Sequence, residues 1–337
     1  MRILISASTK VILTGEHFVV YGAPALSLPI DKRNFVFLEA KKGKGRIFFK
    51  SDRGQAIFFE NRFQGKEDFK IFLPLFSFFF KNKIPFDFKI NFLSKKVPKG
   101  LGNSASLAIA LSFAFFKALK KKPRKKDLFY CGQLVDQIAH GGKPSGIDAQ
   151  TISQGKPQLF QKKFSPLGFS FKNIKIELPP KSSLLVVDTF RGERETTGKL
   201  IKKFALSYGI SKKPEEMKEK ERKKIYQPYL SIFKVILSQL KREGDPEKLG
   251  WALNKNHELL KSVSCREIEK VIRIALKNKA FGAKLTGAGG KGGAVIVFVP
   301  DEKKEDLISL FKKFDFYSFP VNIDTKGIIE EKIKKIK

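Results

Sequence analysis

Two glycine-rich segments carry residues that could bind a phosphate group. The first, Gly100–Ser106 (GLGNSAS), leads directly into the apolar run 104–119, which predicts a buried helix. Glycines let the backbone approach an anion closely, and the free N–H groups at a helix N-terminus attract negative charge. The hydroxyl groups of Ser104 and Ser106 suit helix capping or contact with a phosphate or magnesium ion. The segment therefore fits phosphate binding and an ordinary capped turn equally well.

The second glycine-rich segment, Thr286–Gly293 (TGAGGKGG), lies between two expected strands. A hairpin turn needs only about two to five residues, with one or two glycines among them. Glycine costs chain entropy and offers no side chain for packing. A loop with this much glycine therefore favours a site that clears space for a ligand or for another stretch of backbone.

Two further segments hold charged residues in unusual settings. Asp148 follows the bend KPSG, which would fix the position of its carboxylate, although an aspartate in a turn is also a common helix cap. Glu16 and His17 lie within an otherwise apolar stretch, and the chain has only three histidines. Glutamate in the first turn of a helix is also ordinary structure. Each segment alone leaves its chemistry open.

Strands and helices must bring these segments together. Alternating or apolar runs predict strands at 2–7, 11–13, 34–40, 46–50, 87–92, 169–176, 184–188, 283–285, 294–299 and 316–321. Helical patterns occur at 68–80, 104–119, 127–140, 199–208, 214–242, 246–260, 268–277 and 303–314. Lys41–Lys44 predicts a hairpin connection between the strands on either side, and Trp251 is expected in the core. Both halves mix helices and strands, which indicates an α+β protein with a boundary near residue 180.

Composition excludes several classes of protein. The 337 residues carry 67 Lys and Arg against 33 Asp and Glu, a net charge of +34, yet 42% are hydrophobic, so a packed core is expected. The charge is scattered along the chain, which favours solvated surfaces and attraction of anionic small molecules over a nucleic-acid-binding arm. Two cysteines are too few for a disulfide framework or a four-thiolate zinc site. The start of the chain lacks a secretion signal, and no apolar run reaches the roughly 18 residues of a membrane span. A cytoplasmic, non-membrane protein is expected.

In this order along the chain, the four segments resemble the motifs of the GHMP kinase superfamily and, within it, of the mevalonate kinases. KVILTGEHFVVYGAPAL is similar to the first motif, GLGNSAS to the phosphate loop and KLTGAGGKGG to the third motif. HGGKPSGID resembles the segment that bears the catalytic aspartate, and Arg194-Glu195-Thr196 resembles an R-x-T element. The resemblance extends from about residue 6 to residue 299.

The resemblance implies an α+β, two-domain GHMP kinase fold. Its N-terminal domain, of the ribosomal-protein-S5-like type, would span residues 1–180, and its ferredoxin-like C-terminal domain residues 181–337. ATP and the substrate would bind between them, with magnesium as a cofactor, and the γ-phosphoryl group of ATP would pass to the 5-hydroxyl group of mevalonate. A homodimer is left open, and nucleic acid is not expected as a partner.

Residue roles follow from the same resemblance. Asp148 would be the catalytic aspartate and Lys10 the lysine paired with it. Ser104 and Asp136 would bind magnesium, and the substrate would be contacted by Glu16, His17, Arg194 and Thr196. The residues that would frame the nucleotide are Gly100, Leu101, Gly102, Asn103, Ser104, Ala105, Ser106, Gly287, Ala288, Gly289 and Gly290.

The sequence also departs from the family pattern. The phosphate loop usually reads P-x-G-x-G-L-G-S-S, whereas here Pro98-Lys99 leads directly into GLGNS, so the loop is shorter and Asn103 replaces a serine. Asp136 stands where the family carries a glutamate. Phosphomevalonate kinase, diphosphomevalonate decarboxylase, galactokinase and homoserine kinase are alternatives on the same fold, although GEHFVVYGAPAL favours mevalonate kinase over galactokinase. A non-catalytic basic binding protein on this fold is an alternative of another class.

Overall fold

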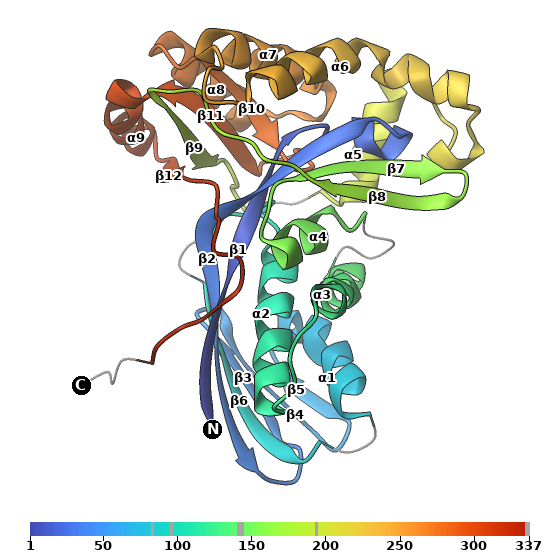
Figure 1. Cartoon of the computed structure of the whole chain (residues 1–337), viewed down its shortest axis with the longest axis vertical. Coiled ribbons are helices and arrows are strands. Elements are labelled where there is room, and N and C mark those ends of the chain that lie inside the picture. Colours follow the sequence, from blue (N-terminus) through green and yellow to red (C-terminus); the bar gives the residue numbers. More distant parts are fainter. Residues whose placement is uncertain (82–83, 95–96, 140–144, 193–194, 334–337) are drawn as a thin grey trace.

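Two sheets, each covered by helices, lie one above the other along the longest axis of the molecule (Figure 1). The structure is a computed structural model, and it describes residues 1–81, 84–94, 97–139, 145–192 and 195–333. Most of the first sheet comes from the N-terminal half of the chain, and the second sheet comes entirely from the C-terminal half. This confirms the α+β expectation.

The first sheet is built around two long strands, β1 (Arg2–Thr14) and β2 (Pro24–Lys42), which pair antiparallel along most of their length. The strand order is β13-β1-β2-β6-β3-β4-β5, and β7 and β8 extend the sheet from the N-terminal part of β2. The remaining strands are β3 (Ile47–Ser51), β4 (Gly54–Phe59), β5 (Arg62–Gly65), β6 (Phe86–Leu93), β7 (Gln158–Phe164) and β8 (Leu167–Asn173).

The predicted hairpin at Lys41–Lys44 is wrong, because β6 lies between β2 and β3. β6 pairs antiparallel with β2 and parallel with β3. Phe88, Ile90 and Phe92 alternate along β6 and are all buried. Alternation puts the three apolar side chains on one face of β6. Because β6 lies between two other strands, the helices beside the sheet cover that face.

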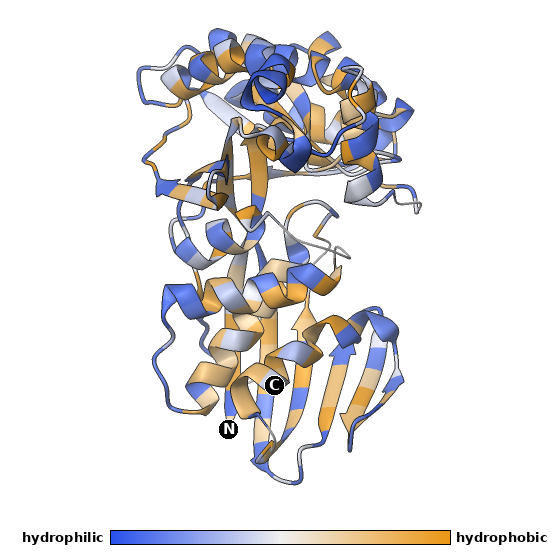
Figure 2. Ribbon diagram, turned by 90° about the vertical axis from the view of Figure 1, so that its right-hand side faces the viewer, coloured by the Kyte–Doolittle hydropathy of each residue, from blue (hydrophilic) through white to orange (hydrophobic). Residues whose placement is uncertain are grey.

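Helices α1 (Leu73–Phe80), α2 (Asn103–Ala118), α3 (Lys125–Ala139) and α4 (Ile147–Gln154) lie together beside the first sheet (Figure 1). Figure 2 shows apolar residues dominating these helices and the strands beside them. Stacked and edge-to-face phenylalanine rings fill the space between the layers, among them Phe49, Phe76, Phe88 and Phe115. The high phenylalanine content therefore serves the core, where each aromatic pair contributes about 0.5–1.5 kcal/mol beyond area burial.

The second sheet is antiparallel throughout, in the order β10-β11-β9-β12. Its strands are β9 (Ser182–Asp188), β10 (Gly282–Thr286), β11 (Ala294–Pro300) and β12 (Tyr317–Val321). The helices of this half are α5 (Thr197–Leu206), α6 (Glu219–Gln239), α7 (Pro246–Glu258), α8 (Arg266–Lys277) and α9 (Lys304–Lys313). Trp251, expected in the core, is 52% exposed on α7. Within the described part of the chain, no helix combines the length and apolarity that crossing a membrane requires.

After β12 the chain returns to the first sheet, where β13 (Ile329–Glu330) pairs with β1. Arg33 on β2 forms an ion pair with Asp324 in this returning segment and donates a hydrogen bond to the carbonyl group of Gly327. Asp324 also accepts hydrogen bonds from the backbone N–H groups of Lys326 (2.7 Å) and Gly327 (2.9 Å). The C-terminal segment therefore fastens the two halves together, and the division into domains at residue 180 stays a prediction.

We expect Asp324→Ala to lower the free energy of unfolding by about 3–5 kcal/mol, because it leaves the guanidinium group of Arg33 buried without its partner. The Asp324 side chain is 2% exposed and that of Arg33 is 11% exposed. The control is Glu39→Ala, which removes the exposed pair with Arg2 and should cost at most about 1 kcal/mol. Urea denaturation measures both, and equal losses in the two variants would contradict the assignment of Asp324 as a fastening residue.

Candidate active site

Lys10 and Asp148 meet where β1 passes the N-terminus of α4. The Lys10 Nζ atom lies 3.0 Å from Asp148 Oδ1 and donates a hydrogen bond to the carbonyl group of Gly100 at 3.1 Å. The Lys10 side chain is 3% exposed, whereas that of Asp148 is 19% exposed. Asp148 lies in the first turn of α4, after Gly146 at the N-cap position. The lysine is therefore buried behind the carboxylate, which reaches the surface of the site.

The glycine turn before α2 lies directly against this pair. The backbone N–H of Lys10 donates to the carbonyl of Leu101 at 2.9 Å. Gly102, at the N-cap of α2, has φ = 73°, and a Cβ atom there would lie 3.2 Å from the Lys10 side chain and 3.3 Å from Asp148 Oδ2. Any larger residue would be strained and would crowd the pair. The structure thus brings together the turn, the lysine and the aspartate that the sequence predicted.

Most side chains of the turn are used within the protein. Asn103 donates from Nδ2 to the carbonyls of Val97 (3.2 Å) and Pro98 (3.1 Å), and its Oδ1 accepts from Asn34 (3.1 Å). The hydroxyl of Ser106 is buried and donates to Ala7. Leu101 and Ala105 are fully buried. The turn therefore offers an anion mainly its backbone N–H groups.

Ser104 contacts a second carboxylate, that of Asp136. Its hydroxyl donates to Asp136 Oδ1 at 2.6 Å. Burial raises the pKa of Asp136 to about 7, and the nearby charge of Asp148 adds to the rise, while Ser104 and Lys10 oppose it. Among the described residues, no group of three or more His, Cys, Asp and Glu could hold a metal ion alone. Two carboxylates and a hydroxyl can still hold magnesium when substrate phosphates complete its shell.

A groove of about 430 Å³ begins at these residues. Asp148, Gly102 and Ser104 line its inner end. It continues past the rings of Phe69 and Phe72 to the turn between β3 and β4. Asp148 thus lies at one end, aromatic side chains lie further along, and Arg53 and Lys66 line the far end. This arrangement suits a ligand with an anionic part and a flat apolar part.

A second buried charged group lies further along the first motif. Glu16 Oε1 accepts a hydrogen bond from Lys284 Nζ at 2.5 Å, and both side chains are almost fully buried. Lys284, on β10, also donates to the carbonyl of Leu285 at 2.7 Å. Burial raises the pKa of Glu16 and lowers that of Lys284, and their mutual attraction opposes both shifts. The pair therefore ties the first motif to the second sheet.

His17 adjoins this pair with a strained backbone, φ = 59°. Its Nε2 atom lies 2.9 Å from the carbonyl oxygen of Ala288, so Nε2 must carry the proton and donate. Burial lowers its pKa to about 4, against the effect of the Ala288 hydrogen bond. The atoms Glu16 Oε2 and His17 Nδ1 are buried and have no hydrogen-bond partner among the described residues. Two buried hydrogen-bond acceptors at this site therefore have no donor among the described residues.

The glycine loop between β10 and β11 closes the site from the second sheet. Thr286 exchanges hydrogen bonds with the backbone of Ile12 on β1, both at 3.0 Å. A Cβ atom on Gly287 would lie 3.5 Å from the carbonyl oxygen of Gly100, so the two glycine-rich segments face each other. At Gly289 a Cβ atom would lie 2.3 Å from the carbonyl oxygen of Val263, so packing within the protein already requires glycine there.

Other predicted residues lie differently. The hydroxyl of Thr196 caps α5 by accepting from the Lys199 N–H, and the side chain is exposed, so its role toward a substrate stays a prediction. Arg194 lies outside the described residues. Sequence reasoning missed Lys284, although it stands in the quoted third motif. A lysine inside an apolar strand was the signal that could have revealed it.

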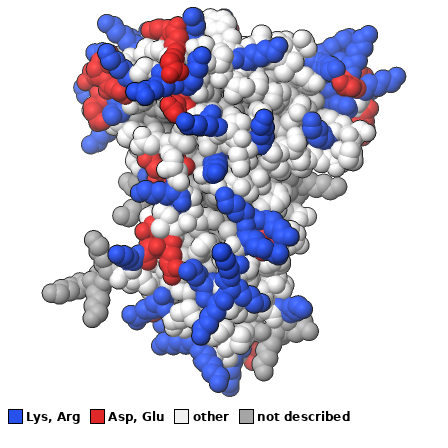
Figure 3. All heavy atoms as spheres, in the orientation of Figure 1, with Lys and Arg blue, Asp and Glu red and all other residues white. Residues whose placement is uncertain are grey.

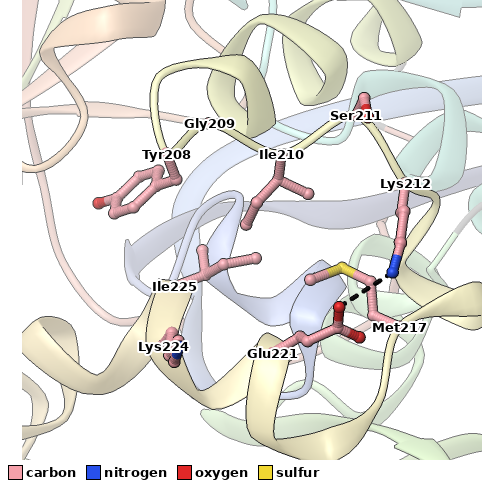
Figure 4. Close-up of a pocket in the computed structure, with 9 residues that line it drawn as sticks. All are labelled: Tyr208, Gly209, Ile210, Ser211, Lys212, Met217, Glu221, Lys224 and Ile225. Carbon is pink, nitrogen blue, oxygen red and sulfur yellow. Dashed lines mark hydrogen bonds and ion pairs between the residues drawn. The ribbon is translucent and has the colours of Figure 1, made fainter.

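A smaller hollow of about 290 Å³ lies between the end of α5 and the start of α6 (Figure 4). Tyr208, Ile210 and Ile225 line it, and the Lys212 and Glu221 side chains at its edge pair at 3.0 Å. These charges compensate each other, and Lys212 is exposed while Glu221 is partly buried. We assign this hollow no chemistry.

Lys and Arg side chains occur over both halves of the molecule in Figure 3, beside scattered Asp and Glu. On the face that the figure shows, basic side chains are therefore not confined to one half of the molecule. A broad positive field attracts small anions to the groove and does not by itself form a nucleic-acid track.

Comparison with known proteins agrees with this geometry. Residues 71–155 match the family model "GHMP kinases N terminal domain", and residues 236–312 match "GHMP kinases C terminal". The mevalonate kinase of Pyrococcus furiosus is 30% identical, with 90% of this chain and 91% of that protein covered. The mevalonate kinase of Methanocaldococcus jannaschii is also 30% identical, covering 94% and 98%. A crystal structure of the Methanococcus jannaschii mevalonate kinase superposes with a TM-score of 0.75 at 26% identity, covering 96% of this chain and 98% of that one.

The buried His17 predicts a pH-dependent stability. Its folded-state pKa of about 4 lies below its ordinary value of 6.5. The stabilising contribution is thus present above pH 6.5 and is lost as the pH falls toward 4, because only the unfolded chain binds the proton. At about 1.4 kcal/mol per pH unit, lowering the pH from 7.5 to 4.5 should cost the wild type about 2–3 kcal/mol relative to His17→Asn. Asparagine tolerates the positive φ. Urea denaturation across this range measures the difference, and parallel pH profiles would refute the assignment.

Proposed function

The chain belongs to the mevalonate kinase family of GHMP kinases, and on that premise we propose that it transfers the γ-phosphoryl group of ATP to the 5-hydroxyl group of mevalonate. The observation that carries the proposal is the contact of Lys10 with Asp148 at 3.0 Å, directly beside the glycine turn before α2. A base and a phosphate-binding turn in contact are what phosphoryl transfer to an alcohol requires. The reaction uses ATP, and we propose that the protein works in the cytoplasm. Whether it forms a homodimer stays a prediction.

The groove supports the binding of ATP. Its inner end offers backbone N–H groups of the turn and the N-terminus of α2, where a phosphate is favoured. The rings of Phe69 and Phe72 lie farther along and suit the flat apolar surface of a purine. The triphosphate would then lie beside Asp148, with the loop 287–290 facing it from the second sheet.

Asp148 is the residue we assign to proton transfer. An alcohol is far too weak an acid to lose its proton to a carboxylate before bond formation begins. In a loose, metaphosphate-like transition state the proton can leave late, as the new P–O bond raises the acidity of the hydroxyl group. Lys10 fixes the orientation of Asp148 through its contact with Oδ1 and its second hydrogen bond to Gly100. It also places a positive charge where negative charge develops.

Magnesium fits the residues at the inner end. The raised pKa of Asp136, caused by burial and by Asp148, marks a place where a cation would relieve repulsion between two carboxylates. Ser104 and Asp136 would hold the ion together with the phosphates. When bound there, magnesium supplies charge neutralisation for the phosphate groups.

Glu16 and His17 support a polar substrate on the other side of Asp148. Their unpaired atoms Oε2 and Nδ1 are acceptors, and hydroxyl groups of mevalonate are donors that can satisfy them. Lys284 places a positive charge beside Glu16, although it is fully buried and paired. Two fixed acceptors would hold a hydroxyl group in position, which lowers the entropic cost of the transfer step.

An ADP-release assay of the purified chain with ATP and magnesium tests the substrate. We expect turnover with mevalonate and little with galactose or homoserine, as the mevalonate kinases to which the chain is similar suggest. Phosphomevalonate should also give little, because its primary hydroxyl group is already phosphorylated. Preference for another compound in the panel would move the chain to a different activity on the same fold. Lack of turnover with all four would contradict the kinase proposal.

Asp148→Asn should lower kcat for mevalonate by about 10²–10⁴, the range for lost general acid–base catalysis. Asparagine keeps the shape of the side chain but cannot take the proton. Asp127→Asn is the matched control, because Asp127 lies on α3 in an exposed pair with Arg124 and should retain full turnover. A kcat of Asp148→Asn near that of the wild type would remove Asp148 from the reaction.

A further inference from the structure

The side chain of Asn103, the first residue of α2, folds back onto the chain that leads into the glycine turn. Its Nδ2 atom donates to the carbonyl groups of Val97 at 3.2 Å and of Pro98 at 3.1 Å, which uses both N–H groups of the amide. Val97 and Pro98 are buried, so their carbonyl groups need donors. One side chain thus closes the loop between residues 97 and 103.

Asn34 on β2 determines which way the Asn103 amide points. Its Nδ2 atom donates to Asn103 Oδ1 at 3.1 Å, so the amide oxygen faces β2 and the amide nitrogen faces the two carbonyl groups. Asn34 is fully buried opposite Ala7 of β1, and its own Oδ1 atom has no hydrogen-bond partner among the described residues. A buried, unsatisfied oxygen costs stability, so an apolar residue would serve packing better. The contribution of Asn34 is therefore the hydrogen bond that it donates.

Two further carbonyl groups of the turn are bound by Lys10. Its Nζ atom donates to the carbonyl of Gly100 at 3.1 Å, and its backbone N–H donates to that of Leu101 at 2.9 Å. The carbonyl oxygen is the negative end of the peptide dipole, so a carbonyl group turned toward the groove would repel a phosphate. The N–H groups in the first turn of α2 have no acceptor within the helix and suit an anion. Binding the carbonyl groups within the protein thus favours an anion at the turn.

We infer that Asn103 and Asn34 are positioning residues for nucleotide binding, which hold carbonyl groups of the loop away from the phosphates. Asn103 supplies the two donors, and Asn34 acts through Asn103 by fixing its orientation. The serine that the family pattern carries at this position has a single donor and could not bind both carbonyl groups. The asparagine therefore accompanies the shorter loop of this chain. The inference rests on the proposed function, because it takes the groove to be the nucleotide site.

The test compares ligands with and without phosphate. Isothermal titration calorimetry of the full chain with magnesium should show that Asn103→Ala weakens ATP binding by about 10-fold, because two hydrogen bonds of ordinary net strength are lost. Binding of adenosine should change by less than about twofold, because adenosine has no phosphate to meet the N–H groups of the turn. In turnover, Asn103→Ala should raise KM for ATP more than KM for mevalonate. A role in folding alone would not produce this selectivity.

A second variant tests whether Asn34 acts through Asn103. Asn34→Leu has a similar volume and leaves the donors of Asn103 in place without the hydrogen bond that orients them, so it should weaken ATP binding by a few-fold. The variant with both substitutions should bind ATP no more weakly than Asn103→Ala alone, whereas additive losses would overturn the role of Asn34. Should Asn103→Ala not fold, a selective loss of ATP binding over adenosine binding in Asn34→Leu tests the same inference.

The matched control is Asn278→Ala. Asn278 follows α8, is exposed and does not line the groove, and its Nδ2 atom also donates to a backbone carbonyl group, that of Ile274 at 2.8 Å. Its ATP affinity should equal that of the wild type. Unchanged ATP binding by Asn103→Ala, or an equal loss of ATP and adenosine binding, would overturn the inference.

The same measurements separate this inference from the proposed reaction. A wild type that phosphorylates mevalonate, together with an unaffected Asn103→Ala variant, would refute the role of Asn103 alone. ATP binding that depends on Asn103, without phosphorylation of mevalonate, would refute the proposed reaction alone.

Discussion

The site depends on the burial of the C-terminal part of β1 between the two sheets. From Lys10 onward this strand contacts elements of both halves that contribute to the site. Lys10 reaches Asp148 and the glycine turn, the backbone of Ile12 pairs with Thr286, and Thr14 lies 2.9 Å from Asn256 Oδ1. One strand thus fixes the distance between the phosphate-binding turn of the first half and the glycine loop of the second. Ordering this strand costs conformational entropy. Packing of its side chains on both faces, as in strands buried between two layers, offsets that cost.

The ion pair of Glu16 with Lys284 shows what this burial costs. Two fully buried charges lose their hydration, and their attraction usually offsets that loss only in part. An apolar pair of similar volume would therefore hold the two halves together at least as well. The chain nevertheless keeps both charges, and two acceptor atoms without a partner among the described residues, Glu16 Oε2 and His17 Nδ1, lie at the same place. This is the pattern of a site that binds a polar ligand, and not of one that serves stability. The strained backbone of His17 belongs to the same pattern.

Local patterns predicted most elements because their signals are local. The alternation of β6, the apolar run of α2 and the amphipathic face of α8 each appear within 8 to 16 residues. Predictions failed where contacts between residues far apart in the sequence decide the structure. The Lys41–Lys44 hairpin failed because β6 enters between β2 and β3, and Trp251 is exposed because α7 turns that face outward. β4 and β5, and β13 at the end of the chain, bury only Ala56 between them, so they carry no apolar pattern.

For the site, the sequence predicted which segments would meet but not how each side chain is used. The order of motifs sufficed to bring Lys10, Asp148 and the glycine turn together. It could not show that Asn103 and Ser106, both candidates for phosphate contact, bond to carbonyl groups within the protein. Buried carbonyl groups need hydrogen-bond donors. In a turn packed this closely, the polar side chains of the turn supply these donors, so they are not left for a ligand. What the turn then offers an anion is its backbone N–H groups, because the Ser104 hydroxyl donates to Asp136. Anion binding here is therefore set by the shape of the chain more than by the identity of its polar residues.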